Sequence, residues 1–216
     1  MHYSSFDSMR RAVKNHVVRD PDLGQRPLKV LDVGGADVNG SYREHFAVSP
    51  WTYRGLDAAA GKNVDIVLRD PYDWREIRTG SADVVISGQA FEHVEFFWLT
   101  MLEIARVLKP EGICCLIAPS GGPEHRYPVD CWRFYPDGFA ALARFASLEV
   151  AEIHSYQGTT GYADGSDQWR DTVLVCRKPA SSGASAITTV LRRYLLHMLL
   201  RQPLGRHGPV FLRPEE

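Results

Sequence analysis

Long apolar runs, a basic excess and C-x-x-C cysteine motifs are all missing from this 216-residue chain. No stretch approaches the roughly twenty apolar residues of a membrane-spanning helix, and residues 1–17 lack the apolar core of a signal peptide. The formal net charge is −1, from 25 Lys and Arg against 26 Asp and Glu. A dedicated nucleic-acid-binding protein normally carries a basic excess. These absences predict no stable membrane insertion and no nucleic-acid partner.

Cysteine is sparse and shows no metal-binding or redox spacing. The chain has four cysteines and no C-x-x-C motif. Cys114 and Cys115 lie side by side in an apolar run, which is typical of small buried hydrophobic residues. A reduced, cytoplasmic protein is therefore expected. The length suits one domain with a full core, and no internal repeat is present.

A complete dinucleotide fingerprint is also missing. Segment 30–43 carries an apolar strand through a glycine pair, Gly34-Gly35, and into a predicted helix. The G-x-G-x-x-G motif would need glycines where Ala36 and Asn39 stand, so pyrophosphate binding is poorly supported. A glycine turn nevertheless lets backbone N–H groups approach a ligand, because glycine has no Cβ.

Two acids frame this glycine turn. Asp32 lies at the end of the first apolar strand, and Asp57 ends a second one about twenty residues later. A carboxylate at the second position can accept hydrogen bonds from two ribose hydroxyls. The pattern predicts a site for a nucleoside-type cofactor.

Strand-like and helix-like segments alternate along the chain, which favours an α/β fold with a mostly parallel sheet and helices on both faces. Strands are expected at residues 28–33, 51–57, 64–68, 82–87, 113–118, 148–155 and 172–177. Helices are expected at residues 6–17, 42–47, 98–108 and 137–145, with a turn at 109–112 and an irregular stretch at 119–136. Residues 1–180 are expected to form the domain.

Residues 181–216 are expected to form a linker and an amphipathic C-terminal helix or tail. A linker rich in Ser, Ala and Gly occupies residues 179–185. Apolar residues at helical spacing follow it: Ile187, Val190, Leu191, Tyr194, Leu195, Met198 and Leu199. This helix is expected to pack on its own domain or on a second subunit, as in a homodimer. A helix lying on a membrane surface is the alternative.

The order of the motifs resembles that of class I S-adenosylmethionine-dependent methyltransferases. The shared features are the acid-plus-glycine turn, Asp57, the strand at 82–87, the pair Glu92-His93 and the turn at 108–112. The chain departs from that pattern at Ala36 and Val38, which occupy usual glycine places. The resemblance implies a Rossmann-like, mostly parallel seven-stranded sheet with an antiparallel last strand, and S-adenosylmethionine as cofactor.

The resemblance also implies how this cofactor is held. Asp57 would bind the ribose, and Gly34-Gly35 would approach the methionine end. Asp70 would lie near the adenine amino group, unless it only forms an Asx-turn before Pro71, and Tyr72 or Trp74 would cover the ring. The expected cofactor-binding residues are Asp32, Gly34, Gly35, Ala36, Asp57, Asp70, Tyr72, Ser87 and Gln89.

Charged and aromatic residues gather at 121–139, GGPEHRYPVDCWRFYPDGF, beyond the fifth strand. Ligands of open α/β sheets bind outside the carboxyl ends of the strands, so this loop is expected to face the reacting methyl group. Mixed charged and aromatic side chains suit a sugar. The expected substrate-binding residues are Glu124, Arg126, Tyr127, Asp130 and Arg133. For Arg126 and Asp130 the alternative is that they only tie down the loop.

The segment HRYPVDCWRFYPDG, at 125–138, is similar to segments of methyltransferases associated with bacterial polysaccharide synthesis. The whole chain most resembles that group, including actinobacterial enzymes linked to methylmannose polysaccharides. The resemblance implies an O-methyltransferase acting on a sugar or short glycan, with a mannoside as the preferred candidate. One alternative is methylation of a small natural-product hydroxyl. Another is a cofactor-binding, methyltransferase-like assembly protein.

Methylation of a sugar hydroxyl needs a group that takes up its proton. His93 and His125 both follow strands and compete for that role, with Glu92 beside them. The same three residues also suit a divalent ion, because some RNA ribose and quinone-type O-methyltransferases hold magnesium in a similar E-x-x-E-H cluster. In this chain Gln89 replaces the first glutamate, which leaves a neutral oxygen ligand. General-base chemistry and Mg²⁺-assisted chemistry both stay open.

The other histidines show no partner pattern in the sequence. They are His2, His16, His45, His154, His197 and His207. No role is assigned to them.

Overall fold

Seven strands form one sheet in the order β3-β2-β1-β4-β5-β7-β6. The computed structural model describes residues 2–46, 50–156 and 161–180, together with residues 191, 194–196, 198 and 199. The strands are β1 (Lys29–Val33), β2 (Thr52–Asp57), β3 (Ile66–Val67), β4 (Ala82–Gly88), β5 (Leu108–Ala118), β6 (Glu149–Ser155) and β7 (Thr172–Arg177). Pairing is parallel from β3 across to β5, and β7 runs antiparallel to both β5 and β6. The expected fold class is confirmed.

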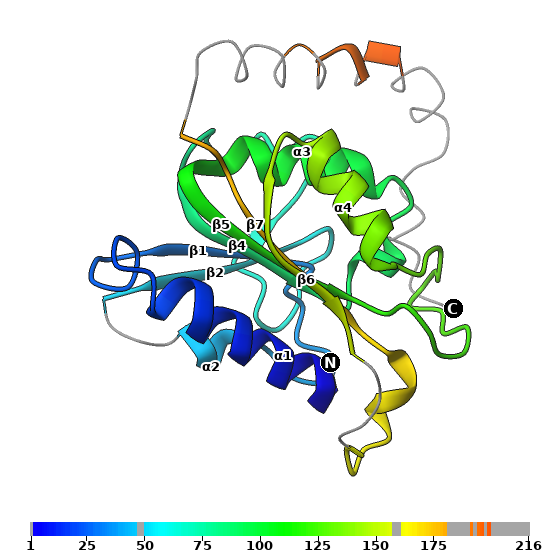
Figure 1. The fold of residues 1–216 in the computed structure, drawn as a ribbon. Coiled ribbons are helices and arrows are strands. Elements are labelled where there is room, and N and C mark those ends of the chain that lie inside the picture. Colours follow the sequence, from blue (N-terminus) through cyan, green and yellow to red (C-terminus); the bar gives the residue numbers. More distant parts are fainter. Residues whose placement is uncertain are drawn as a thin grey trace.

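Helices cover both faces of this sheet (Figure 1). The helices are α1 (Tyr3–Val13), α2 (Arg43–Phe46), α3 (Phe97–Val107) and α4 (Pro136–Phe145). A π-helical turn (Lys14–Val18) extends α1, and 3₁₀ turns occur at Phe91–His93 and Ser166–Trp169. Helices α1 and α2 lie on one side of the sheet, and α3 and α4 on the other (Figure 1). This arrangement leaves the carboxyl ends of the parallel strands uncovered by helices, and the loops with the candidate site residues follow these ends.

Apolar side chains of the central strands are buried on both faces. Residues 82–87 of β4 and 113–118 of β5 are buried throughout, as expected for parallel strands covered by helices on both sides. Two apolar clusters fill the spaces between sheet and helices, and Met9, Val13 and Val17 of the N-terminal helical segment belong to one of them. Cys114 and Cys115 are buried free thiols, which confirms their prediction as small core residues.

The expected turn at residues 109–112 lies within β5, which already begins at Leu108. Glu111 has φ +64°, and the pairing of β5 with β4 shifts register between Leu108 and Ile113. Leu108 pairs with Ala82, and the main chain of Glu111 and Gly112 bonds to Lys178 next to β7. Pro, Glu and Gly in succession are typical of a turn. These residues therefore form a bulge between two paired parts of β5, and Lys178 supplies hydrogen-bond partners for its backbone.

Only part of the predicted C-terminal helix is described. Residues 191, 194–196, 198 and 199 are helical. Leu196 packs against the domain core, whereas the exposed apolar residues are Leu191, Tyr194, Leu195, Met198 and Leu199. Ala47, Ile187, Val190, His197 and His207 lie outside the described residues. Among the described residues, no helix has the length and apolarity needed to cross a bilayer.

Candidate active site

The glycine turn lies where β1 ends, beside the ends of β2 and β4. Gly34 has φ +73°, and a Cβ added there would lie 2.4 Å from the Cβ of Ala90. The chain therefore needs glycine at this position. The N–H groups of Gly34 and Gly35 donate to the Leu56 carbonyl at 3.0 and 3.1 Å. These two N–H groups, which were expected to face a ligand, are thus hydrogen-bonded to the end of β2 instead.

Asp57 lies at the end of β2 and faces this turn. Its two carboxylate oxygens accept hydrogen bonds from the backbone N–H of Ala36, at 3.3 Å, and of Ala58, at 2.7 Å. The residue is half-buried, and burial raises the pKa of its carboxyl group. Each oxygen keeps a lone pair for a further donor. This is the geometry that a hydroxyl-binding carboxylate requires.

Two other expected cofactor residues are turned into the protein. Asp32 is buried, accepts a hydrogen bond from the Tyr53 hydroxyl, and has its pKa raised to about 7, mainly by burial. The Ser87 hydroxyl is also buried and donates to the Val33 carbonyl at 2.8 Å. Both side chains support the strand ends rather than facing solvent.

The segment after β3 forms an Asx-turn, the alternative considered for Asp70. The Asp70 carboxylate accepts the backbone N–H of Tyr72 at 2.8 Å. Trp74 is fully buried and its indole N–H donates to the Pro71 carbonyl, so Trp74 is not available to cover an adenine ring. Tyr72 is buried beside Phe96. Of the two aromatic candidates, only Tyr72 stays in consideration.

A network that the sequence did not reveal surrounds Gln89. This residue follows β4 with φ +57°, and its side chain bonds to His2 at 2.9 Å, Asp171 at 3.0 Å and Ser5 at 3.2 Å. The His2 ring also stacks on Trp169. His2, to which the sequence assigned no role, is thus bonded and stacked in the fold. No short motif could have shown it, because His2 and Gln89 are 87 positions apart.

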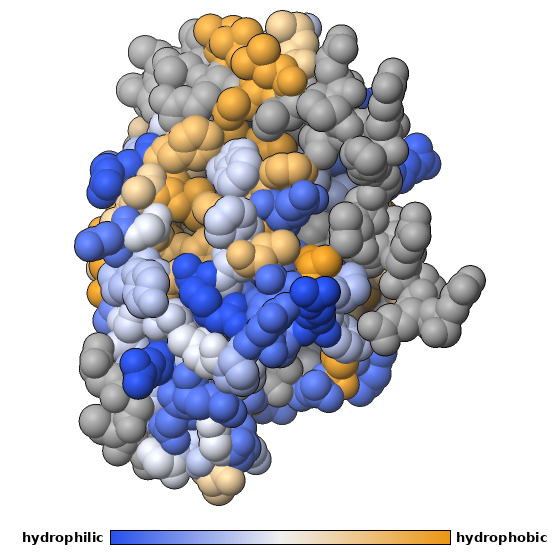
Figure 2. Space-filling model, turned by 90° about the vertical axis from the view of Figure 1, so that its right-hand side faces the viewer, coloured by the Kyte–Doolittle hydropathy of each residue, from blue (hydrophilic) through white to orange (hydrophobic). Residues whose placement is uncertain are grey.

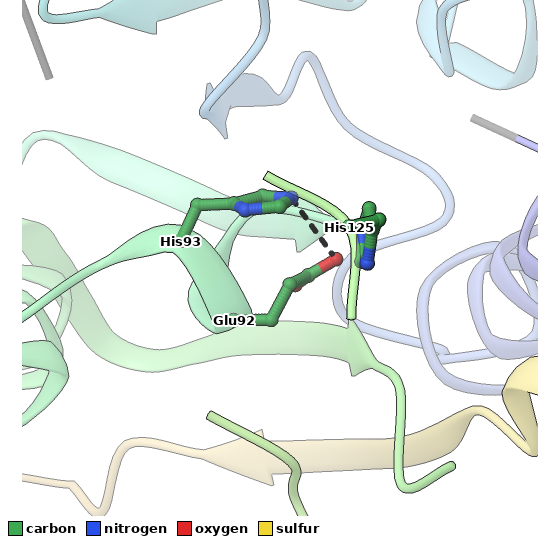
Figure 3. Close-up of side chains that lie close together, drawn as sticks. All are labelled: Glu92, His93 and His125. Atoms are coloured by element: carbon green, nitrogen blue, oxygen red, sulfur yellow. Dashed lines mark ion pairs between the residues drawn. The ribbon is translucent and has the colours of Figure 1, made fainter. Parts of the chain in front are cut away.

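Glu92, His93 and His125 come together above the end of the sheet (Figure 3). One potential ligand atom from each lies within 4.8 Å of the others. Glu92 and His93 belong to the 3₁₀ turn after β4, and His125 comes from the loop after β5. The two imidazole rings meet edge to face with centroids 4.9 Å apart. The structure thus places the expected catalytic residues in one cluster.

The Glu92 carboxylate is the unusual member of the cluster. It is completely buried, and neither oxygen has a hydrogen-bond partner. Burial raises the pKa of this carboxyl group to about 8. The nearest cationic candidate is His93 Nε2, 3.7 Å from Glu92 Oε1. A buried polar group without partners is costly, so its presence points to a partner that is not a protein group.

The two histidines are held by different contacts. His93 Nδ1 lies 2.5 Å from the Val129 carbonyl, which fixes the proton on Nδ1 and leaves the Nε2 lone pair toward Glu92. Burial lowers the pKa of His93. His125 packs against Trp169, with ring centroids 4.6 Å apart. Its buried Nδ1 has no hydrogen bond and lies 3.3 Å from the Asp130 carboxylate. Both rings can therefore accept a proton or bind a cation.

The loop after β5 is anchored by a buried ion pair. Arg133 binds both carboxylate oxygens of Asp130, at 2.5 and 2.7 Å, and the His125 backbone N–H donates to the same carboxylate. Burial acts to raise the pKa of Asp130, but these hydrogen bonds lower it overall to about 2. The backbone N–H groups of Cys131 and Trp132 donate to the Glu92 carbonyl. For Asp130, the interpretation as a loop anchor fits these contacts.

Other side chains of this loop are exposed. Glu124 and Arg126 form a solvent-exposed pair, and Tyr127 is 61% exposed. Trp132 is partly exposed and contacts Phe97 edge to face. In Figure 1 the loop after β5 projects toward the side that Figure 2 views. That face carries hydrophilic residues over its middle and lower parts and apolar residues above (Figure 2).

Comparison with known proteins supports a methyltransferase domain. Residues 32–116 match a family described as a methyltransferase domain, a span that runs from β1 to β5 and includes the glycine turn and Glu92-His93. No curated protein matched the chain. Similar folds occur among many solved structures, including three that share 15–18% sequence identity with this chain.

Three of these structures indicate the range of proteins that share the fold. A chain from the complex of the Haloferax volcanii Trm112 methyltransferase activator with a methyltransferase has a TM-score of 0.59 at 18% identity, covering 82% of this chain and 91% of that one. The Burkholderia thailandensis 1,6-didemethyltoxoflavin-N1-methyltransferase, solved with S-adenosylhomocysteine, has a TM-score of 0.58 at 15% identity, with 82% and 84% coverage. The cyclase SpnF has a TM-score of 0.60 at 15% identity, with 81% and 82% coverage.

Proposed function

We propose that this chain, which has the class I methyltransferase fold, is an S-adenosylmethionine-dependent O-methyltransferase. Its acceptor would be a hydroxyl of a sugar or short glycan, with mannosides as the first candidates. The domain would comprise residues 1–180, with residues 181–216 as linker and tail. The observation that carries the proposal is the cluster of Glu92, His93 and His125 at the same sheet edge as Asp57 and the glycine turn.

The cofactor site is assigned to the turn between β1 and α2 and to the end of β2. S-adenosylmethionine, when bound, supplies an electrophilic methyl group on a cationic sulfur. Asp57 would accept the ribose hydroxyls through the lone pairs that Ala36 and Ala58 leave free. Gly34 and Gly35 are the proposed neighbours of the methionine end, although Ala90 and not a ligand takes the space that a Gly34 side chain would need. Tyr72 and Asp70 are the candidates for the adenine end.

The chemical role of the cluster is to take up the proton of the acceptor hydroxyl. His93 Nε2 is suited to this role, because its ring is oriented through Nδ1 and its pKa is lowered. His125 is the second candidate, and both assignments are proposals. The same three residues also suit a divalent cation, for which the sequence resemblance implies Mg²⁺. Holding the acceptor oxygen in line with the methyl group and its sulfur would supply much of the remaining rate acceleration.

A sugar acceptor is favoured by the loop that borders the cluster. Glu124, Arg126 and Tyr127 are exposed, and Trp132 offers a partly exposed ring on which a sugar face can stack. Arg133 and Asp130 would shape this surface by fixing the loop rather than by touching the acceptor. A purely apolar acceptor would leave the charged side chains unused.

The assembly-protein alternative draws support from one observation. The N–H groups of Gly34 and Gly35 are already bonded to Leu56, so the turn offers fewer donors than expected. We also propose a cytoplasmic location, which the four free cysteines favour. A homodimer through the C-terminal helix is proposed from the exposed apolar residues Leu191, Tyr194 and Leu195.

Calorimetric titration with S-adenosylmethionine, followed by labelled methyl transfer to a mannoside panel, tests the function. The Asp57→Ala variant should bind the cofactor on the order of 100-fold more weakly, because a charged acceptor of hydroxyl donors is lost. The Asp22→Ala variant, changed at an exposed acid, is the control. Equal affinity in wild type and Asp57→Ala would refute the ribose assignment. Cofactor binding without methyl transfer to any glycoside would refute the proposed acceptor class.

A further inference from the structure

The three clustered side chains resemble an incomplete coordination sphere. Both oxygens of the fully buried Glu92 carboxylate lack hydrogen-bond partners. The buried Nδ1 of His125 also lacks a hydrogen bond, although it lies 3.3 Å from the Asp130 carboxylate. Folding a chain around several unsatisfied polar atoms at one point is costly. Figure 3 shows the carboxylate directed toward the space between the two imidazole rings. A cation in that space would satisfy all three groups together.

We propose that Glu92, His93 and His125 bind one divalent transition-metal ion, of the series from Mn²⁺ to Zn²⁺, in preference to Mg²⁺. The set consists of two imidazoles and one carboxylate. Imidazole nitrogen suits Zn²⁺, Fe²⁺, Co²⁺ and Ni²⁺, whereas Mg²⁺ takes oxygen ligands and keeps several waters. The donor set therefore selects against the ion that the sequence resemblance implied.

Surrounding contacts orient these ligands. The Val129 carbonyl holds Nδ1 of His93, so its Nε2 is the free ligand atom, a common support for metal-binding histidines. The Glu92 backbone carbonyl accepts two N–H groups from residues 131 and 132. His125 is fixed by its backbone N–H, which donates to Asp130, and by ring contact with Trp169. The positions of the ligands are thus set by contacts that do not involve the ion.

Gln89 does not complete the set. Its side-chain oxygen bonds to His2 and its amide donates to Ser5 and Asp171, so this residue does not supply a fourth ligand. Three protein ligands leave open positions on the ion, as in catalytic rather than structural metal sites. We assign the open positions to two neighbouring hydroxyls of the sugar acceptor, an assignment that rests on the proposed function.

The main rival interpretation needs no metal. A protonated Glu92 could donate a hydrogen bond to His93 after a small shift, since the two groups are 3.7 Å apart. In that case the cluster would be a structural pair, and added metal would change nothing. Direct measurement of metal binding separates these interpretations.

Titration of metal-stripped full-length protein with Co²⁺, Mn²⁺, Zn²⁺ and Mg²⁺, followed by calorimetry and by the visible absorption of Co²⁺, tests the proposal. Wild type should bind one equivalent of Co²⁺, and Mg²⁺ should bind at least about tenfold more weakly. Glu92→Gln and, separately, His125→Ala should weaken Co²⁺ binding on the order of 100-fold. His154→Ala and Glu149→Gln, at exposed positions of β6, should bind Co²⁺ as wild type does.

The proposal is overturned by three results: no saturable Co²⁺ binding, equal affinity for Mg²⁺, or unchanged binding in both ligand variants. Because His125 lies in a loop, its variant keeps the test decisive even if Glu92→Gln does not fold. Methyl α-mannoside should alter the Co²⁺ spectrum, and an unchanged spectrum would overturn the acceptor assignment. Metal binding without any methyl transfer would refute the proposed function while leaving the metal site intact.

Discussion

At the scale of single residues, buried carboxyl groups give the clearest physical signal. Asp32 is buried near the end of β1 with one partner, the Tyr53 hydroxyl, and its pKa of about 7 is well above the ordinary 3.8. The main cause is burial, which disfavours the charged form. Burying Asp32 next to the glycine turn therefore costs free energy of folding when its carboxyl group would be ionised in the unfolded chain, and this cost rises with pH.

The pKa of Asp32 predicts a falling stability between about pH 4 and pH 7. The folded state holds a proton that the unfolded state releases, so the free energy of unfolding decreases as pH rises. The Asp32→Asn variant keeps an oxygen for Tyr53 but carries no charge. Its advantage over wild type should grow by a few kcal/mol across this range, at roughly 1.4 kcal/mol per unit.

Urea unfolding of ligand-free protein at pH 5 and pH 8 measures this difference. Groups other than Asp32 titrate in both proteins, so they cancel in the comparison. The Asp22→Asn variant, changed at an exposed residue, should follow wild type at both pH values. Parallel pH profiles for Asp32→Asn and wild type would show that Asp32 is ionised in the folded protein.

At the scale of elements, the loop from β5 to α4 is the most informative. It has no regular structure between residues 119 and 135, and yet it carries His125 to the cluster. The N–H groups of residues 131 and 132 fasten it to the Glu92 carbonyl, and the Asp130–Arg133 pair, which also accepts the His125 N–H, ties the loop to itself. The ion pair therefore acts through the loop on the position of His125.

Arg133→Met should loosen this loop without changing the sheet. The Asp130 carboxylate, whose side chain is only 2% exposed, would lose its guanidinium partner, at a cost of about 3 kcal/mol. Hydrogen exchange should accelerate at the amides of residues 131 and 132. Arg126→Met, which removes one half of an exposed pair, should leave exchange unchanged. Exchange that is equally slow in both variants would contradict the anchoring role.

At the scale of the whole molecule, the N-terminal helix is bonded to the segment that precedes β7. Ser4 donates to Asp171 at 2.8 Å, and the Tyr3 backbone N–H donates to Asp164. Asp171 also accepts from Gln89, next to the cluster. Segments that are more than 160 positions apart thus meet at one edge of the sheet.

Asp171→Ala should destabilise the whole domain, by about 2–4 kcal/mol, because the side chains of Ser4 and Gln89 lose a buried acceptor. Asp164→Ala, at an exposed acid that also contacts the N-terminal helix, should cost less than about 1 kcal/mol. Urea unfolding followed by circular dichroism measures both. Equal losses in the two variants would show that the network around Asp171 is not the main link.

The sequence by itself determined most of the secondary structure of the domain and its alternating order, and it predicts the edge at which ligands bind. Repeating apolar residues report burial locally, as in residues 82–87 of β4. Parallel strands bring their carboxyl ends to one edge, so Asp57 and Glu92-His93 were expected there. Glu92 and His93 are neighbours in the sequence, so their closeness could be predicted without knowledge of the fold.

Only the tertiary structure decided which polar groups are free. The N–H groups of Gly34 and Gly35 are bonded to Leu56, and Gln89 is bonded to His2, whereas the Glu92 carboxylate has no partner. These outcomes depend on strand order, register and contacts between distant segments. Local residue patterns carry no information about such contacts, because hydrogen-bond partners are chosen by the packing of the complete fold.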